Sequence, residues 1–173
     1  MSTERSNAVT LRGKAFTLVG PELQVGDPAP EFTILQSKNM SPFSASDLTG
    51  KARVLSVIPS LDTPVCEAQT RRFQKEAENL EEVRIYTISM DLPFAQTRWC
   101  RAAGVDKVQM LSDHRDASFS QAYGTLIKEL RLDCRALFVL DEENRLCYVE
   151  YVREVADHPD YDKALDAIRQ VVG

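Results

Sequence analysis

The sequence predicts an α/β fold with a central mixed sheet flanked by helices and an N-terminal β-hairpin before it. Short apolar runs, typical of buried strands, alternate along the chain with longer segments of helical periodicity. Near the C-terminus two apolar segments come before a single helix, which makes the sheet mixed instead of wholly parallel. The chain has 173 residues, and we expect one domain spanning residues 1–173.

The N-terminal part of the chain predicts a disordered segment, a hairpin and one short strand. Residues 1–8 are polar and are expected to be frayed. The hairpin follows from apolar residues that alternate on either side of a turn at Gly13; they are Val9, Leu11, Phe16 and Leu18. Prolines and glycines predict a loop over 20–30, and 32–35 reads as a strand. The stretch up to residue 51 is expected to be loop with one helical turn.

The middle of the chain predicts strands and helices in alternation. Residues 53–58 form a compact apolar run, as in a strand buried on both faces. A helix is expected from about residue 64 to residue 80, with an apolar face made of Val65, Ala68, Phe73, Ala77 and Leu80. Strands are then expected at residues 83–90 and 108–111, and helices at 93–103 and 116–123.

The C-terminal part predicts a second hairpin and a final helix. Its strands are expected at 136–140 and 146–152, on either side of the polar turn 141–145. The helix is expected over 159–172, with its apolar side formed by Leu165, Ile168, Val171 and Val172.

Composition and charge exclude several classes of protein. The 21 basic and 26 acidic residues give a formal net charge of −5, so the chain as a whole does not attract nucleic acid or anionic membranes. Its apolar runs are shorter than the roughly 18–20 residues that span a bilayer. The N-terminus has no apolar stretch of the secretory kind, so we expect a cytoplasmic protein. In that setting catalytic or redox-active cysteines are favoured over structural disulfides.

The segment 59–66 carries the chemistry. It lies between a predicted buried strand and a predicted helix, with Thr63 suited to the N-cap and Pro64 to the first helical position. Cys66 then falls at the third helical position, where free N–H groups and the helix dipole stabilise a thiolate.

Three segments resemble a known family. The pattern Pro59-x-x-x-Thr63-x-x-Cys66 is similar to the active-site motif of the peroxiredoxins, and residues 56–73 as a whole resemble their thiol peroxidase subfamily. The segment 91–100 resembles the subfamily's resolving-cysteine region, and 135–141 resembles the strand bearing its active-site arginine. The resemblance runs from about Val9 to the C-terminus.

The resemblance implies a thioredoxin-like fold and a role for each matching residue. Cys66 would be the peroxidatic cysteine, whose thiolate becomes a sulfenic acid when it attacks a hydroperoxide. Thr63 would hydrogen-bond the thiolate and the peroxide, Arg135 would stabilise the thiolate and hold the leaving oxygen, and Pro59 would shield the pocket from water. Cys100 would resolve the sulfenic acid as an intramolecular disulfide.

Partners are implied in the same way. The family typically uses thioredoxin or a similar dithiol as reductant and forms homodimers, and no metal or bound organic cofactor is implied. Because Cys66 lies in one predicted helix and Cys100 in another, we expect one or both helix ends to unwind before a disulfide forms.

Two other interpretations remain open. One is a redox relay or sensor that passes the oxidation of Cys66 to a partner protein. The other is a thiol acyl-transfer enzyme, which would need His114 or His158 beside Cys66. Cys134 and Cys147 are expected to be packing residues on adjacent strands. No C-x-x-C pair occurs, which argues against a zinc site and against a thioredoxin-type dithiol.

Overall fold

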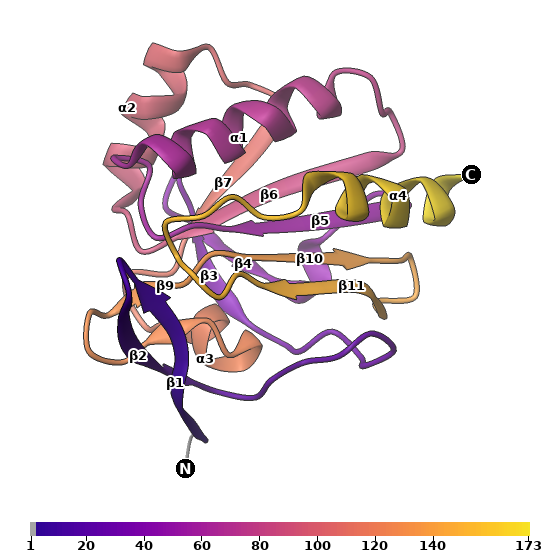
Figure 1. The fold of residues 1–173 in the computed structure, drawn as a ribbon. Helices are drawn as coiled ribbons and strands as arrows, with labels where there is room; N and C mark the ends of the chain where they lie inside the picture. Colours follow the sequence, from indigo (N-terminus) through magenta and orange to yellow (C-terminus); the bar gives the residue numbers. More distant parts are fainter. Residues whose placement is uncertain (1–2) are drawn as a thin grey trace.

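A computed structural model describes residues 3–173 and has a central mixed sheet with helices on both faces (Figure 1). The strands of the hairpin and of the first half are β1 (Glu4–Leu11), β2 (Lys14–Val19), β3 (Thr33–Gln36), β4 (Pro42–Ser44), β5 (Ala52–Val57) and β6 (Val83–Ser89). The later strands are β7 (Val108–Ser112), β8 (Leu126–Ile127), β9 (Leu132–Asp133), β10 (Ala136–Leu140) and β11 (Leu146–Tyr151). The helices are α1 (Pro64–Ala77), α2 (Pro93–Ala103), α3 (Ser118–Tyr123) and α4 (Tyr161–Val172), with a 3-10 turn η1 (Ala45–Asp47). Within residues 3–173, no helix is both long enough and apolar enough to pass through a bilayer.

The central sheet has seven strands in the order β11-β10-β5-β6-β7-β3-β4. Its core β5, β6 and β7 are parallel, and β10 runs antiparallel beside β5. All of β5 except Arg53 is buried, as its continuous apolar sequence predicts. Ala136 of β10 pairs with Val57 of β5. The residue just before β10 therefore lies at the end of β5 from which the chain continues toward α1.

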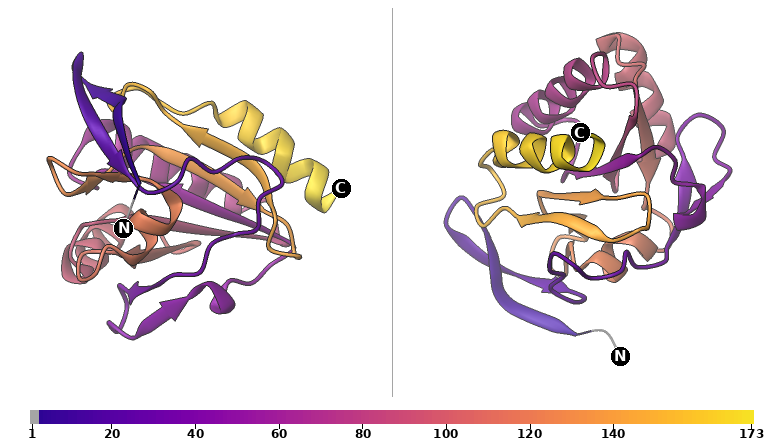
Figure 2. Two further views of the ribbon diagram at one scale, coloured as in Figure 1. Left: turned by 90° about the horizontal axis from the view of Figure 1, so that it is seen from below. Right: turned by 90° about the vertical axis from the view of Figure 1, so that its right-hand side faces the viewer.

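Each face of the sheet has its own apolar core. Helices α1, α2 and α4 lie on one face, whereas α3 and the β1–β2 hairpin lie on the other (Figures 1 and 2). Phe73 of α1 and Leu165 of α4 belong to the first core. Val9 of the hairpin and Phe119 of α3 belong to the second. The face of α4 expected to be apolar is indeed buried at Leu165 and Ile168.

The N-terminus differs from the prediction. Residues 4–8 were expected to be frayed, but they form the first part of β1, which pairs with β2 from Glu4 onward. Their mostly polar sequence lacks the apolar alternation that would predict a strand. Arg5 stabilises this part of β1, because its guanidinium donates hydrogen bonds to the backbone oxygens of Gly20 and Gly124. Residues 1–2 of the predicted frayed segment lie outside the described residues.

Three short strands were not predicted. β4 lies in the region expected to be loop, and β8 and β9 join the hairpin in a second sheet of order β1-β2-β8-β9. Strands of two or three residues are too short to show a periodic pattern, so only their pairing with other strands reveals them. The first long helix also ends earlier than expected, at Ala77 instead of Leu80.

Candidate active site

The chain between β5 and α1 places a cysteine in the first turn of a helix. α1 begins at Pro64, so Cys66 is its third residue, as predicted. The relative exposure of Cys66 is 0 %, and its thiol is free. N–H groups of a first helical turn lack intrahelical acceptors, and the helix dipole is positive there. This helix end therefore offsets part of the cost of placing negative charge on a buried sulfur.

Arg135 is the hydrogen-bonding partner of that sulfur. Its Nη2 atom donates to Sγ of Cys66 at 3.2 Å. Its Nε atom donates to the backbone oxygen of Val155 at 2.9 Å, and Nη1 donates to Oε1 of Gln69 at 2.9 Å. Only 2 % of Arg135 is exposed, and a buried guanidinium is stable only when its donors have acceptors. Two neutral acceptors thus orient the positive charge toward the sulfur.

Gln69 is a site residue that the sequence analysis missed. It lies three residues after Cys66 on the same face of α1 and is 0 % exposed. Its amide group is fully oriented, since Oε1 accepts from Arg135 and Nε2 donates to Oγ of Ser56 at 2.8 Å. A polar residue at this spacing from the cysteine was the available signal. A glutamine on a helix is ordinarily exposed, however, so its spacing alone does not predict a buried role.

The buried face of α1 also differs from the predicted one. Of the five apolar residues expected to face the core, only Phe73 is fully buried, whereas Ala68 is exposed. The face that meets the sheet consists of Cys66, Gln69, Thr70, Phe73 and Gln74. Hydrogen bonds make this polar face tolerable. The Thr70 hydroxyl donates to the backbone oxygen of Cys66, and Gln74 donates to Asp106.

Thr63 and Pro59 lie in the loop that leads into α1. Thr63 is at the predicted N-cap position, but its hydroxyl makes no capping hydrogen bond. The hydroxyl instead donates to the backbone oxygen of Ser60 at 3.1 Å, and the side chain is exposed. No hydrogen bond joins Thr63 to the Cys66 sulfur among residues 3–173. Pro59 is buried near the start of the strand-to-helix connection, two residues after the end of β5.

Cys100 lies on α2, against the same core as Cys66. It is half-buried and free, and burial raises the pKa of its thiol to about 11. Its neighbour Trp99 packs under the guanidinium of Arg71, with 5.7 Å from that group to the ring centroid. The two cysteines are thus held in separate helices, and the raised pKa keeps the Cys100 thiol protonated at neutral pH.

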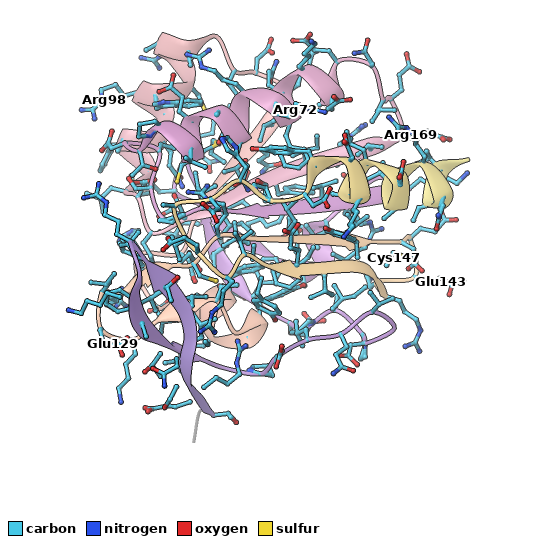
Figure 3. All side chains as sticks on the ribbon, viewed as in Figure 1. Arg72, Arg98, Glu129, Glu143, Cys147 and Arg169 are labelled. Carbon is cyan, nitrogen blue, oxygen red and sulfur yellow. The ribbon has the colours of Figure 1, made fainter. Side chains whose placement is uncertain are left out.

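The other cysteines and the histidines are not part of this arrangement. Cys134 is buried in the core on the opposite face of the sheet, where burial raises the pKa of its thiol. Figure 3 labels Cys147 near the start of β11, at the end of the sheet away from the first turn of α1. His158 is exposed and hydrogen-bonded to the hydroxyl of Tyr161. Within residues 3–173, no imidazole makes a hydrogen bond to Cys66, which an acyl-transfer site would require.

Comparisons with known proteins agree with this geometry. The family model that matches is Redoxin, over residues 24–165. The thiol peroxidase of Bacillus subtilis (strain 168) is 54 % identical over 164 residues, covering 95 % of this chain and 98 % of that protein. The thiol peroxidase of Listeria innocua serovar 6a is 47 % identical over 162 residues, covering 94 % and 98 %.

Solved structures give the same result for the fold. A peroxiredoxin-like protein from Aquifex aeolicus matches with a TM-score of 0.87 at 35 % identity, covering 98 % of both chains. A thiol peroxidase from Chromobacterium violaceum matches with a TM-score of 0.83 over 94 % of this chain and 95 % of that one. At 18 % identity the second match speaks for the fold alone. The expectation of a thioredoxin-like α/β fold with an N-terminal hairpin is confirmed.

Proposed function

Because the chain belongs to the Redoxin family, as a thiol peroxidase of the peroxiredoxin type, we propose that it reduces hydrogen peroxide and organic hydroperoxides through Cys66. The observation that carries this proposal is the 3.2 Å hydrogen bond from Arg135 Nη2 to Cys66 Sγ inside a buried site. A fixed positive charge beside a helix-terminal sulfur suits a thiolate nucleophile.

The first step is attack of the Cys66 thiolate on one peroxide oxygen. A sulfur–oxygen bond forms and the oxygen–oxygen bond breaks, so the sulfur is oxidised to a sulfenic acid. The other oxygen leaves as hydroxide or alkoxide and takes up a proton to become water or alcohol. Arg135 is placed to stabilise the charge that develops on this leaving oxygen.

Ionisation of the Cys66 thiol alone cannot account for the rate enhancement of a peroxidase. An ordinary cysteine is a few per cent thiolate at pH 7, so full ionisation increases the reactive form by about 30-fold at most. The remainder must come from stabilisation of the leaving group. We assign it to Arg135 and to the Thr63 hydroxyl, three residues before Cys66. This hydroxyl donates to the Ser60 oxygen in the peroxide-free protein and would have to leave it to reach the peroxide. The buried Pro59 limits the access of water.

The second step is attack of Cys100 on the sulfenic acid, which forms a disulfide and releases water. A disulfide requires Cα atoms within roughly 7 Å, whereas the two cysteines are held within separate helices. We therefore expect a helix end to unwind, which also removes the burial that raises the pKa of Cys100. A dithiol reductant of the thioredoxin type then restores both thiols, and we expect the enzyme to act as a homodimer.

Mass-spectrometric disulfide mapping after one equivalent of hydroperoxide tests this cycle. We expect a Cys66–Cys100 link within one chain, lost in Cys100→Ser and retained in the matched Cys147→Ser. Oxidation of Cys66 with Cys100 still free would contradict the two-cysteine cycle and favour a relay. Rapid multiple turnover with thioredoxin separates a peroxidase from a relay, and an unmodified Cys66 would overturn the proposal.

A further inference from the structure

We infer that Asp91 is a positioning residue that holds both cysteine-bearing helices in the conformation that reacts with peroxide. The inference rests on the proposed function. Asp91 lies just after β6 and just before α2, far in sequence from the loop that it contacts. It lies outside the motif Pro59-x-x-x-Thr63-x-x-Cys66, and within residues 3–173 its side chain makes no hydrogen bond to either cysteine.

The carboxylate of Asp91 binds the loop that leads into α1. Its Oδ1 accepts a hydrogen bond from the Ser60 hydroxyl at 2.7 Å, and its Oδ2 accepts from the backbone N–H of Leu61 at 2.8 Å. Oδ2 also accepts from the Ser89 hydroxyl at 2.8 Å. These three hydrogen bonds to an ionised acceptor are stronger than neutral ones. They join the loop to the end of a central strand.

The effect of Asp91 reaches the active site through Ser60. The backbone oxygen of Ser60 accepts from the Thr63 hydroxyl at 3.1 Å and from the Thr63 N–H at 3.4 Å. Thr63 is the N-cap of α1, three residues before Cys66. A displaced Ser60 would therefore move the start of the first helical turn and the hydroxyl that we assign to the peroxide.

The same residue also fixes the start of α2. Leu92, the next residue, is the N-cap of that helix, and Cys100 lies within it. The backbone oxygen of Asp91 accepts from the Ser112 hydroxyl at 2.6 Å, which ties this point to the end of β7. One residue thus joins the beginnings of the two cysteine-bearing helices, at least one of which must unwind before the cysteines can meet.

This connection predicts opposite effects on the two fates of oxidised Cys66. When Asp91 binds the loop before α1, Cys66 stays in the conformation that reacts with peroxide. This favours both the first oxidation, to sulfenic acid, and the second, to sulfinic acid. When the loop is not bound by Asp91, the helix end unwinds more readily, which favours the Cys66–Cys100 disulfide. Loss of the Asp91 carboxylate should therefore slow the first oxidation and, at the same time, protect Cys66 from overoxidation.

The experiment compares Asp91→Ala with two other variants. In Asp91→Ala we expect the second-order rate constant with peroxide to fall about tenfold, and the peroxide concentration that half-converts Cys66 to sulfinic acid to rise about five- to tenfold. Asp91→Asn should lose clearly less than Asp91→Ala, because its amide oxygen can still accept from Leu61 and its amide nitrogen can donate to Ser60, although these bonds are weaker than those to a carboxylate. Ser112→Ala removes the hydrogen bond at the start of α2 without touching the loop. It should leave the rate constant with peroxide unchanged and shift the ratio of sulfinic acid to disulfide less than Asp91→Ala does.

A purely structural role predicts a different result. Asp91→Ala and Ser112→Ala would then lower thermal stability without changing that ratio, and the inference would be wrong. Amide hydrogen exchange of Leu61 in the reduced protein gives a test that does not depend on the redox cycle. Exchange should accelerate in Asp91→Ala and not in Ser112→Ala, and equal exchange in both would also overturn the inference. If wild-type Cys66 forms no disulfide, the proposed function fails, and this exchange measurement still decides the role of Asp91.

Discussion

The contact between Gln69 and Arg135 gives a quantitative prediction for Gln69→Leu. Leucine keeps most of the side-chain volume but removes the acceptor of Arg135 Nη1 and the donor to Ser56. Arg135 keeps its bonds to Val155 and Cys66. Its guanidinium should therefore stay buried while one N–H group loses its partner.

The magnitudes follow from these lost contacts. A hydrogen bond to a charged group contributes about 1.5–3 kcal/mol, and an unpaired buried donor costs about 1–3 kcal/mol. The buried Ser56 oxygen also loses its donor, so we expect the free energy of unfolding to fall by about 2–4 kcal/mol. The Arg135 guanidinium stays at the site but is less firmly oriented toward the sulfur. We therefore expect about 1–2 kcal/mol less stabilisation of the transition state, or about 5- to 30-fold in the rate constant.

Stopped-flow fluorescence measures that rate constant. The sequence contains a single tryptophan, Trp99, beside Cys100, so its emission should report oxidation. Gln74→Leu is the matched control. Gln74 is a buried glutamine of the same helix, and it bonds to Asp106 and Lys107 instead of Arg135. It should lose comparable stability and keep its rate constant.

Two results would refute the reasoning. A Gln69→Leu enzyme that is destabilised but reacts at the wild-type rate would show that Gln69 only packs. Equal losses of rate in Gln69→Leu and Gln74→Leu would show that any weakening of α1 slows the reaction, whatever orients Arg135.

Three further predictions concern pH and packing. Burial raises the pKa of Cys100 to about 11. If unwinding exposes Cys100 before it reacts, the rate of disulfide formation, measured by acid quenching at a series of pH values, should level off near an ordinary thiol pKa of about 8.5. A rate that keeps rising toward pH 11 would indicate attack from within α2. Burial also raises the pKa of Asp133. The contribution of its protonated form to folding stability is therefore fully present below about pH 4 and is lost as the pH rises. In urea titrations Asp133→Asn should become more stable relative to the wild type as the pH rises, and a difference that does not change with pH would contradict this. Gly124 and Gly104 have nearly equal φ angles of 70° and 69°, but only at Gly124 would a Cβ lie 1.9 Å from the backbone oxygen of Pro21. Gly124→Ala should thus lower the unfolding free energy by about 1–3 kcal/mol more than Gly104→Ala in thermal denaturation, and equal losses would contradict the predicted clash.

The candidate site was predictable where its signals are local. A proline at the first helical position and a threonine before it fix where α1 starts, so Cys66 could be placed at its third residue from sequence alone. Gln69 could not be assigned in the same way, because a glutamine on a helix is ordinarily exposed. Its role depends on Arg135, which is 66 residues away in sequence.

The sequence by itself determined the alternation of strands and helices, the start of the cysteine-bearing helix and the end of α2 at Gly104, whose φ of 69° suits glycine. These features depend on neighbouring residues, such as apolar runs, proline and glycine. Only the tertiary structure decided that β10 pairs with β5 so that Arg135 meets Cys66, that residues 4–8 form a strand, and that Asp91 holds the loop before α1. Pairing register and side-chain contacts between distant segments depend on which surfaces pack together, and no local pattern of residues specifies that.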